Sequence, residues 1–225
     1  DSFPNVTVEL KVENRQRQPV VGLKEVNFFL TEGSRPVSVQ KLSGSGDLNT
    51  FADITIIIDR SSSMKQYAAE VQSAVREIAS SMKGMGTLRI VSAGSVPATE
   101  MINAPQSFTQ FSESLLKTPY TSSTVLDTAL RLSANDLITA QKKRAVIFIT
   151  DGNVSQNSFQ RYGLSELTAY YNNNGIPLCT VNVSQRALDA EIQYLSTQTG
   201  GSVYYVYRTE GLSSIYTDIL SIPRG

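Results

Sequence analysis

Hydrophobic and polar positions follow two different patterns along the chain. Residues 1–50 contain short apolar stretches that alternate with polar residues, a pattern typical of strands with one buried face. The predicted strands are Val6–Val12, Val26–Leu30 and Val37–Leu42, with Glu32–Pro36 between the last two. Because a segment of this size rarely forms its own core, we expect a β-strand appendage that packs on the larger domain, on chain outside this sequence, or on a partner. The sequence LSGSGDLNT, residues 42–50, is the predicted linker.

From Phe51 onward, continuous apolar runs alternate with segments whose apolar residues recur at helical spacing. The predicted strands are Ile54–Ile58, Leu88–Val91, Glu100–Ile102 at an edge, Arg144–Thr150, Leu178–Val183 and Ser202–Tyr207. The predicted helices are Met64–Met82, Phe108–Leu116, Thr124–Ala140, Leu164–Tyr171, Ala187–Ser196 and Leu212–Leu220. This alternation predicts one α/β domain over residues 51–225, doubly wound, with a mainly parallel central sheet flanked by helices.

Two of the apolar strands end in an acidic residue. Asp59 follows Ile54–Ile58, and Asp151 follows Arg144–Thr150. The carboxyl ends of parallel strands share one edge of the sheet, where ligands bind in such folds. We therefore expect the two carboxylates to converge, although they are far apart in the sequence.

Hydroxyl side chains accompany these acids. Ser61 and Ser63 lie at alternate positions after Asp59, and Thr124 follows the loop TPYTSS. The predicted ligands are therefore Asp59, Ser61, Ser63, Thr124 and Asp151, all of which offer oxygen. Oxygen donors with few charges favour Mg²⁺, with Mn²⁺ or Ca²⁺ as alternatives, whereas zinc prefers nitrogen or sulfur.

These residues resemble the motifs of the von Willebrand factor A domain family. Asp59-Arg60-Ser61-Ser62-Ser63 matches the D-x-S-x-S signature, the threonine after a Gly- or Ser-rich loop matches Thr124, and the strand ending in Thr-Asp-Gly matches Thr150–Gly152. Two usual glycines are replaced by Ser62 and Ser123. The resemblance covers residues 51–220 and implies a Rossmann-like fold.

The resemblance also implies a metal-ion-dependent adhesion site. In such a site Ser61, Ser63 and Thr124 contact the ion directly or exchange contact with water, and Asp59 and Asp151 act directly or through water. The last coordination position is taken by an exposed Asp or Glu of a partner protein. Ser62, Tyr120 and Asn153 flank the predicted site and are candidate partner contacts.

The N-terminal segment is similar to short β regions that precede A domains in some bacterial secreted or surface proteins. It therefore implies an extracellular, periplasmic or cell-surface location. The sequence itself contains neither a signal peptide nor an apolar stretch long enough to span a membrane.

Composition excludes several other functions. The 20 basic and 20 acidic residues cancel, so nothing favours nucleic acid or an anionic membrane as partner. The absence of histidine excludes His-dependent triads and the usual zinc hydrolase sites. Ser62 and Lys65 satisfy S-x-x-K, but the K-T-G element of penicillin-recognising enzymes is missing.

The sequence thus favours a non-enzymatic, metal-dependent protein-binding module for adhesion or assembly. One alternative is a structural scaffold unit, in which the ion only braces loops and the β appendage binds the partner. Another is an enzyme with a magnesium-bound water as nucleophile, for which the sequence offers no obvious general base. Cys179 is the single cysteine and is predicted to be a buried apolar residue.

Overall fold

The computed structural model describes residues 8, 10, 12, 24–38, 51–103, 119–140, 143–155, 158–206 and 212–222. It divides the chain into two compact units, Asp1–Thr50 with Pro223–Gly225, and Phe51–Ile222. Most of the predicted strand Val6–Val12, the linker at residues 42–50 and the predicted helix Phe108–Leu116 lie outside the described residues.

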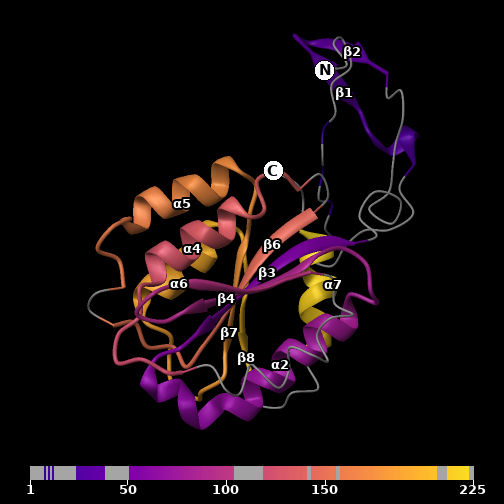
Figure 1. Ribbon diagram of the computed structural model, residues 1–225. Coiled ribbons are helices and arrows are strands. Elements are labelled where there is room, and N and C mark those ends of the chain that lie inside the picture. Colours follow the sequence, from indigo (N-terminus) through magenta and orange to yellow (C-terminus); the bar gives the residue numbers. More distant parts are fainter. Residues whose placement is uncertain are drawn as a thin grey trace. The chain divides into compact units, whose positions relative to one another are not determined.

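The first unit contains a small antiparallel hairpin of β1 (Leu30–Glu32) and β2 (Arg35–Val37), preceded by the 3-10 helix η1 (Glu25–Asn27) (Figure 1). The predicted β character is confirmed, but the predicted boundaries are wrong. Of the strand expected at Val26–Leu30, only Leu30 lies in a strand, whereas Val26 and Asn27 belong to η1, where the Asn27 side chain accepts the Lys24 backbone N–H at 2.8 Å. The segment expected to separate two strands forms the hairpin instead, since Gly33 and Ser34 adopt the positive φ angles of a tight turn.

The second unit contains a six-stranded sheet in the order β5-β4-β3-β6-β7-β8. Its strands are β3 (Ala52–Asp59), β4 (Leu88–Ala93), β5 (Ala98–Asn103), β6 (Lys143–Thr150), β7 (Leu178–Asn182) and β8 (Val203–Tyr205). All neighbours are parallel except the edge strand β5, which runs antiparallel to β4. The predicted doubly wound, mainly parallel sheet is therefore confirmed.

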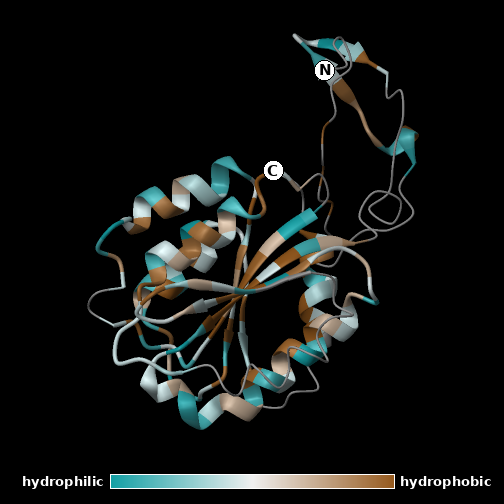
Figure 2. Ribbon diagram, viewed as in Figure 1, coloured by the Kyte–Doolittle hydropathy of each residue, from teal (hydrophilic) through white to brown (hydrophobic). Residues whose placement is uncertain are grey.

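Helices cover both faces of this sheet (Figure 1). They are the 3-10 helix η2 (Ser62–Tyr67) and the α-helices α2 (Ala68–Ser81), α4 (Leu126–Asn135), α5 (Leu164–Asn173), α6 (Ala190–Gln198) and α7 (Ser213–Ser221). Figure 2 shows the sheet as predominantly apolar, with mixed apolar and polar positions on the helices. Among the described residues, no helix combines the length and apolar character that a bilayer span requires.

The core consists of two apolar clusters, one on each face of the sheet. One contains residues of α2 and α7, such as Val75 and Ile215, and the other contains residues of α4, α5 and α6, such as Leu130 and Leu167. The central strands alternate between the clusters: Ile56 belongs to the first and Ile57 to the second. A strand buried on both faces requires the continuous apolar run that identifies β3 in the sequence.

Several helices begin later than predicted, and two of these differences concern residues of the predicted site. The chain after Asp59 forms η2 before α2 starts at Ala68. The helix predicted from Thr124 starts at Leu126, because the Val125 N–H donates to the Gly94 carbonyl at 2.9 Å and the Thr124 N–H is directed to the Ser155 hydroxyl. Thr124 therefore lies in the loop before α4.

Candidate metal centre

Asp59 and Asp151 lie at the carboxyl ends of the adjacent parallel strands β3 and β6. The Asp59 residue is 3% exposed and Asp151 is 1% exposed. Asp59 accepts two hydrogen bonds, from the Ser61 N–H at 2.8 Å and from the Thr150 hydroxyl at 2.8 Å. Burial raises the pKa of Asp59 to about 6, and the negative charge of Asp151 contributes to this rise, while the two hydrogen bonds oppose it. The fold thus brings two buried acids into electrostatic contact.

Ser61 and Ser63 place their hydroxyl oxygens together, with a distance of 3.1 Å between the two Oγ atoms. The Met64 N–H donates to the Ser61 carbonyl at 3.0 Å, which closes the first turn of η2 and brings alternate side chains to one side. Both serines are half-buried. The two hydroxyls therefore lie together on the segment that follows Asp59. The Ser61 N–H of this segment also orients the Asp59 carboxylate.

The loop that carries Thr124 lies against the Asp59 loop. The Thr121 N–H donates to the Arg60 carbonyl at 2.7 Å, and Thr121 forms an isolated bridge with Ser61. Thr124 is buried, and its Oγ1 lies 3.2 Å from the Ser155 Oγ and 3.1 Å from the Ser158 Oγ. Thr124 is thereby linked to the loop that follows Asp151. Nothing in the sequence singles out Ser155 and Ser158, because serines in a loop give no signal of their own.

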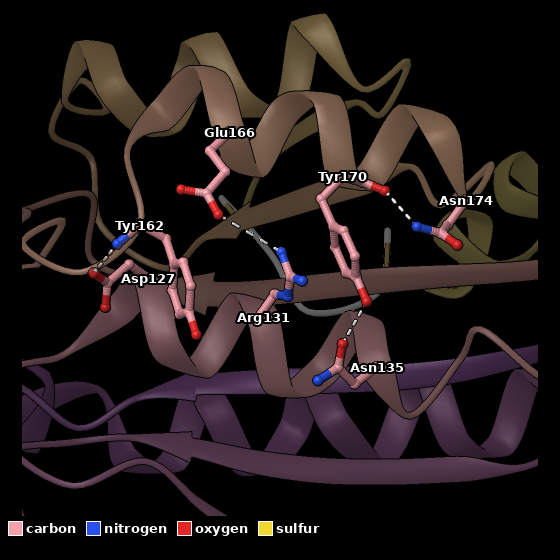
Figure 3. A network of polar contacts seen from close by, with 7 residues as sticks. All are labelled: Asp127, Arg131, Asn135, Tyr162, Glu166, Tyr170 and Asn174. Carbon is pink, nitrogen blue, oxygen red and sulfur yellow. Dashed lines mark hydrogen bonds and ion pairs between the residues drawn. The ribbon is translucent and has the colours of Figure 1, made fainter.

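Asp127 connects the start of α4, which follows the Thr124 loop, with the segment 158–162 (Figure 3). This residue lies in the first turn of α4 and is completely buried. Its Oδ2 accepts the backbone N–H groups of Arg161 at 2.7 Å and Tyr162 at 3.0 Å, and its own N–H donates to the Ser158 carbonyl at 2.8 Å. A buried carboxylate with backbone N–H partners is a strong attachment. Asp127 therefore fixes the segment 158–162 relative to the Thr124 loop.

Arg60 lies between two predicted ligands, yet its side chain points into the protein and is 1% exposed. Its Nε donates to the Ser92 hydroxyl at 3.2 Å, and its guanidinium lies 4.0 Å from the Glu100 carboxylate and 5.6 Å from the centre of the Tyr120 ring. The sequence alone indicates no role for Arg60. Its contacts attach the Asp59 loop to β4 and β5.

The three candidate partner contacts differ in exposure. Ser62 and Asn153 are exposed, and Tyr120 is half-buried against Arg60. The Ser62 hydroxyl donates to the Thr121 carbonyl at 3.0 Å, and the Asn153 N–H donates to the Asp151 Oδ1 at 3.2 Å. All three therefore belong to the loops that carry the predicted ligands.

The chemistry of this donor set fits a hard divalent cation. Two buried carboxylates approach each other, and in the described part of the chain neither forms an ion pair with a basic side chain. The neighbouring side chains contribute neutral hydroxyls, so a cation would supply the missing positive charge. No group of three or more His, Cys, Asp or Glu residues suited to a metal lies in the described segments. A site with two carboxylates and three hydroxyls does not depend on such a group.

Comparisons with known proteins are consistent with this architecture. No curated protein matches the chain. A von Willebrand factor type A structure from Catenulispora acidiphila matches with a TM-score of 0.60 and 13% identity, over 76% of this chain and 42% of that chain. The pilus adhesin SpaC from Lactobacillus rhamnosus GG matches with a TM-score of 0.56 and 13% identity, over 76% of this chain and 30% of that one.

A third similar structure is proximal thread matrix protein 1 from the mussel byssus, in which zinc occupies the metal-ion-dependent adhesion site (MIDAS) motif. It matches with a TM-score of 0.57 and 15% identity, over 77% of this chain and 47% of that one. The present chain thus spans less than half of each of these three proteins, and the likeness concerns the fold. Residues 53–218 match the von Willebrand factor type A domain family, to which this chain therefore belongs.

Proposed function

We propose that the unit Phe51–Ile222 is a non-enzymatic module that binds a partner protein through a divalent cation. Asp59, Ser61, Ser63, Thr124 and Asp151 hold the ion, which accepts an Asp or Glu side chain of the partner. The observation that carries this proposal is the approach of two buried carboxylates, Asp59 and Asp151, at the edge where the two serine hydroxyls also lie.

The proposed ligands differ in charge, and other groups orient them. Asp59 and Asp151 provide the two negative charges, and Ser61, Ser63 and Thr124 provide neutral oxygens. A cation bound by such a set retains positive charge and acts as an electrophile toward an incoming carboxylate. The Thr150 hydroxyl and the Ser61 N–H hold the Asp59 carboxylate in place before the ion arrives.

We propose Mg²⁺ as the ion, with Mn²⁺ or Ca²⁺ as substitutes. Carboxylate and hydroxyl oxygens are hard donors, and Mg²⁺ binds few carboxylates and keeps part of its water shell. The zinc in the MIDAS motif of the mussel byssus protein supports a divalent cation in this fold and makes zinc the ion to compare. Competition between Mg²⁺ and Zn²⁺ in solution tests this choice.

The absence of histidine supports a role without catalysis, because the sequence lacks the side chain most often used as a general base. Asp59 and Asp151, the buried acids of the site, are assigned to the ion. An extracellular, periplasmic or cell-surface location belongs to the same proposal. Its support is the likeness to a pilus adhesin and to a byssus protein.

The proposal is tested by titrating the protein with Mg²⁺ in a calorimeter. We expect one ion per chain in the wild type and no measurable binding in Asp151→Asn or in Ser61→Ala with Ser63→Ala. Asp218→Asn, which changes an exposed acid on α7, is the matched control and is expected to bind as the wild type does. Unchanged Mg²⁺ affinity in a folded Asp151→Asn protein would contradict the proposal.

A further inference from the structure

The loop between β7 and α6, residues 183–189, lies against the loop that carries Asp151. The Ser184 hydroxyl donates to the Asp151 carbonyl at 2.6 Å, and the Asp189 N–H donates to the Gly152 carbonyl at 2.9 Å. The Asp189 carboxylate accepts the Val154 N–H at 2.6 Å. The approach is so close that a side chain at Gly152 would lie 3.2 Å from the Ala187 carbonyl oxygen. The two loops therefore form one continuous rim at the candidate metal centre.

Buried polar side chains fix the position of Arg186 within this rim. Asn182 is 0% exposed, and its amide donates to the Arg186 carbonyl at 2.7 Å. Ser184 is 5% exposed, and its hydroxyl accepts the Arg186 N–H at 3.1 Å. The Ser184 N–H in turn donates to the Asn182 Oδ1 at 2.9 Å. Both backbone polar groups of Arg186 are thus held by residues that are themselves buried.

The Arg186 side chain, in contrast, is exposed, and it forms no ion pair within the described part of the chain. Its neighbours Ser184 and Ala187 both contact the Asp151–Gly152 turn. A cation on a rigid backbone beside a carboxylate-binding site suits a second negative group on the same partner. Such an arrangement gives orientation and specificity in addition to affinity.

We propose that Arg186 is a second recognition point for the partner, which presents a protein segment with two acidic side chains. One carboxylate reaches the ion and the other pairs with the Arg186 guanidinium. This inference rests on the proposed function, because it assigns the first carboxylate to the metal centre. It adds a specificity residue outside the metal ligands and narrows the partner to a diacidic segment.

The test uses synthetic glycine-based peptides with blocked ends and the whole chain in Mg²⁺. One series carries two aspartates separated by zero to four glycines, and the matched series has asparagine in place of the second aspartate. NMR titration gives each affinity. We expect at least one diacidic spacing to bind roughly two- to fivefold more tightly than its matched peptide, the range of an exposed ion pair.

Substitutions then identify the cation responsible. Arg186→Gln is expected to abolish the diacidic preference while Mg²⁺ affinity stays unchanged, and Arg186→Lys to retain part of the preference. Arg76→Gln, an exposed position on α2, and Lys65→Gln, an exposed position on η2, are matched controls that should keep it.

The outcomes separate this inference from the proposed function. Equal affinity of the wild type for both peptide series, or a preference that survives in Arg186→Gln, would overturn the role of Arg186. Loss of the preference in Lys65→Gln instead would overturn it as well. If no acidic peptide binds in a Mg²⁺-dependent manner, the proposed function itself fails, and the inference fails with it.

Discussion

The Thr150 hydroxyl donates a hydrogen bond of 2.8 Å to the Oδ2 of Asp59, across the parallel pair β3 and β6. The Thr150 Oγ1 in turn accepts a hydrogen bond from the Gly152 N–H at 3.1 Å. One buried side chain thereby connects the first acid of the candidate centre with the turn that carries the second. The family motif Thr-Asp-Gly contains this threonine, but the sequence does not reveal that its partner is Asp59.

The substitution Thr150→Val removes this connection and keeps the shape of the side chain. We expect the free energy of unfolding to fall by about 1.5 to 3 kcal/mol, the range for a hydrogen bond to a charged group. We also expect Mg²⁺ affinity to fall by about tenfold, because an outer residue no longer orients Asp59. Urea denaturation and calorimetry measure the two effects. Unchanged values in both would show that the hydroxyl has no role.

The same substitution at Thr55 has the opposite expected effect and serves as the control. Thr55 lies in β3, is completely buried, and its Oγ1 has no hydrogen-bond partner among the described residues. Burial of an unpaired hydroxyl costs about 1 to 3 kcal/mol in mutational series. Thr55→Val should therefore stabilise the protein by about 1 kcal/mol in urea denaturation and leave Mg²⁺ affinity unchanged. A destabilised Thr55→Val protein would contradict this account.

Asp127→Asn tests the attachment between the Thr124 loop and the segment 158–162. The asparagine amide would place an N–H donor against the backbone N–H donors of Arg161 and Tyr162, where the carboxylate accepts. We therefore expect the free energy of unfolding to fall by about 2 to 4 kcal/mol. Hydrogen exchange of the Arg161 and Tyr162 amides should accelerate at the same time. Asp136→Asn, at the other end of α4, is the control, because the Asp136 Oδ2 is buried without a hydrogen-bond partner among the described residues. Equal losses in both variants would argue against a specific role for Asp127.

Cys179 gives a prediction about pH. Burial raises the pKa of its thiol to about 11 from an ordinary value of 9.0. The folded state therefore holds the proton more tightly than the unfolded state does. The resulting stability is fully present below about pH 9 and is lost as the pH rises through about 11, with a magnitude on the order of 3 kcal/mol.

Two measurements check this prediction. The folded protein should not react with a thiol reagent at pH 8, whereas the urea-unfolded chain should react completely. Cys179→Ala should reduce the loss of stability between pH 9 and 11. Rapid labelling of the folded protein at pH 8 would show that Cys179 is accessible.

Much of the fold follows from the sequence, because strands buried on both faces are identified by unbroken apolar runs. Ile54–Ile58 and Arg144–Thr150 correspond closely to the central strands β3 and β6. The convergence of Asp59 and Asp151 then follows from the parallel topology alone. The turn of the hairpin at residues 30–37 falls within the predicted separator Glu32–Pro36, but the strands β1 and β2 extend into this separator, which their sequence does not indicate.

The supporting parts of the site could not be predicted, because they depend on contacts between distant loops. Arg60 occupies a variable motif position in the sequence, and only the fold shows that it is buried against Ser92 and Glu100. Asn182 and Ser184 belong to a sequence, Asn-Val-Ser, that also matches a glycosylation acceptor. Both side chains are buried and form hydrogen bonds with the Arg186 backbone. The neighbouring residues in the sequence do not indicate these contacts.

The position of β3 in the middle of the sheet has a consequence for biosynthesis. Asp59 emerges from the ribosome before its neighbours in the candidate centre, which belong to a loop and a strand that follow it in the sequence. The strand β6 must pair with β3 before Asp151 can approach Asp59. A nascent chain that ends before β6 therefore lacks the candidate metal centre. Ion uptake would therefore report the completion of folding, and a cation that binds only the native chain would shift the equilibrium toward that state by mass action.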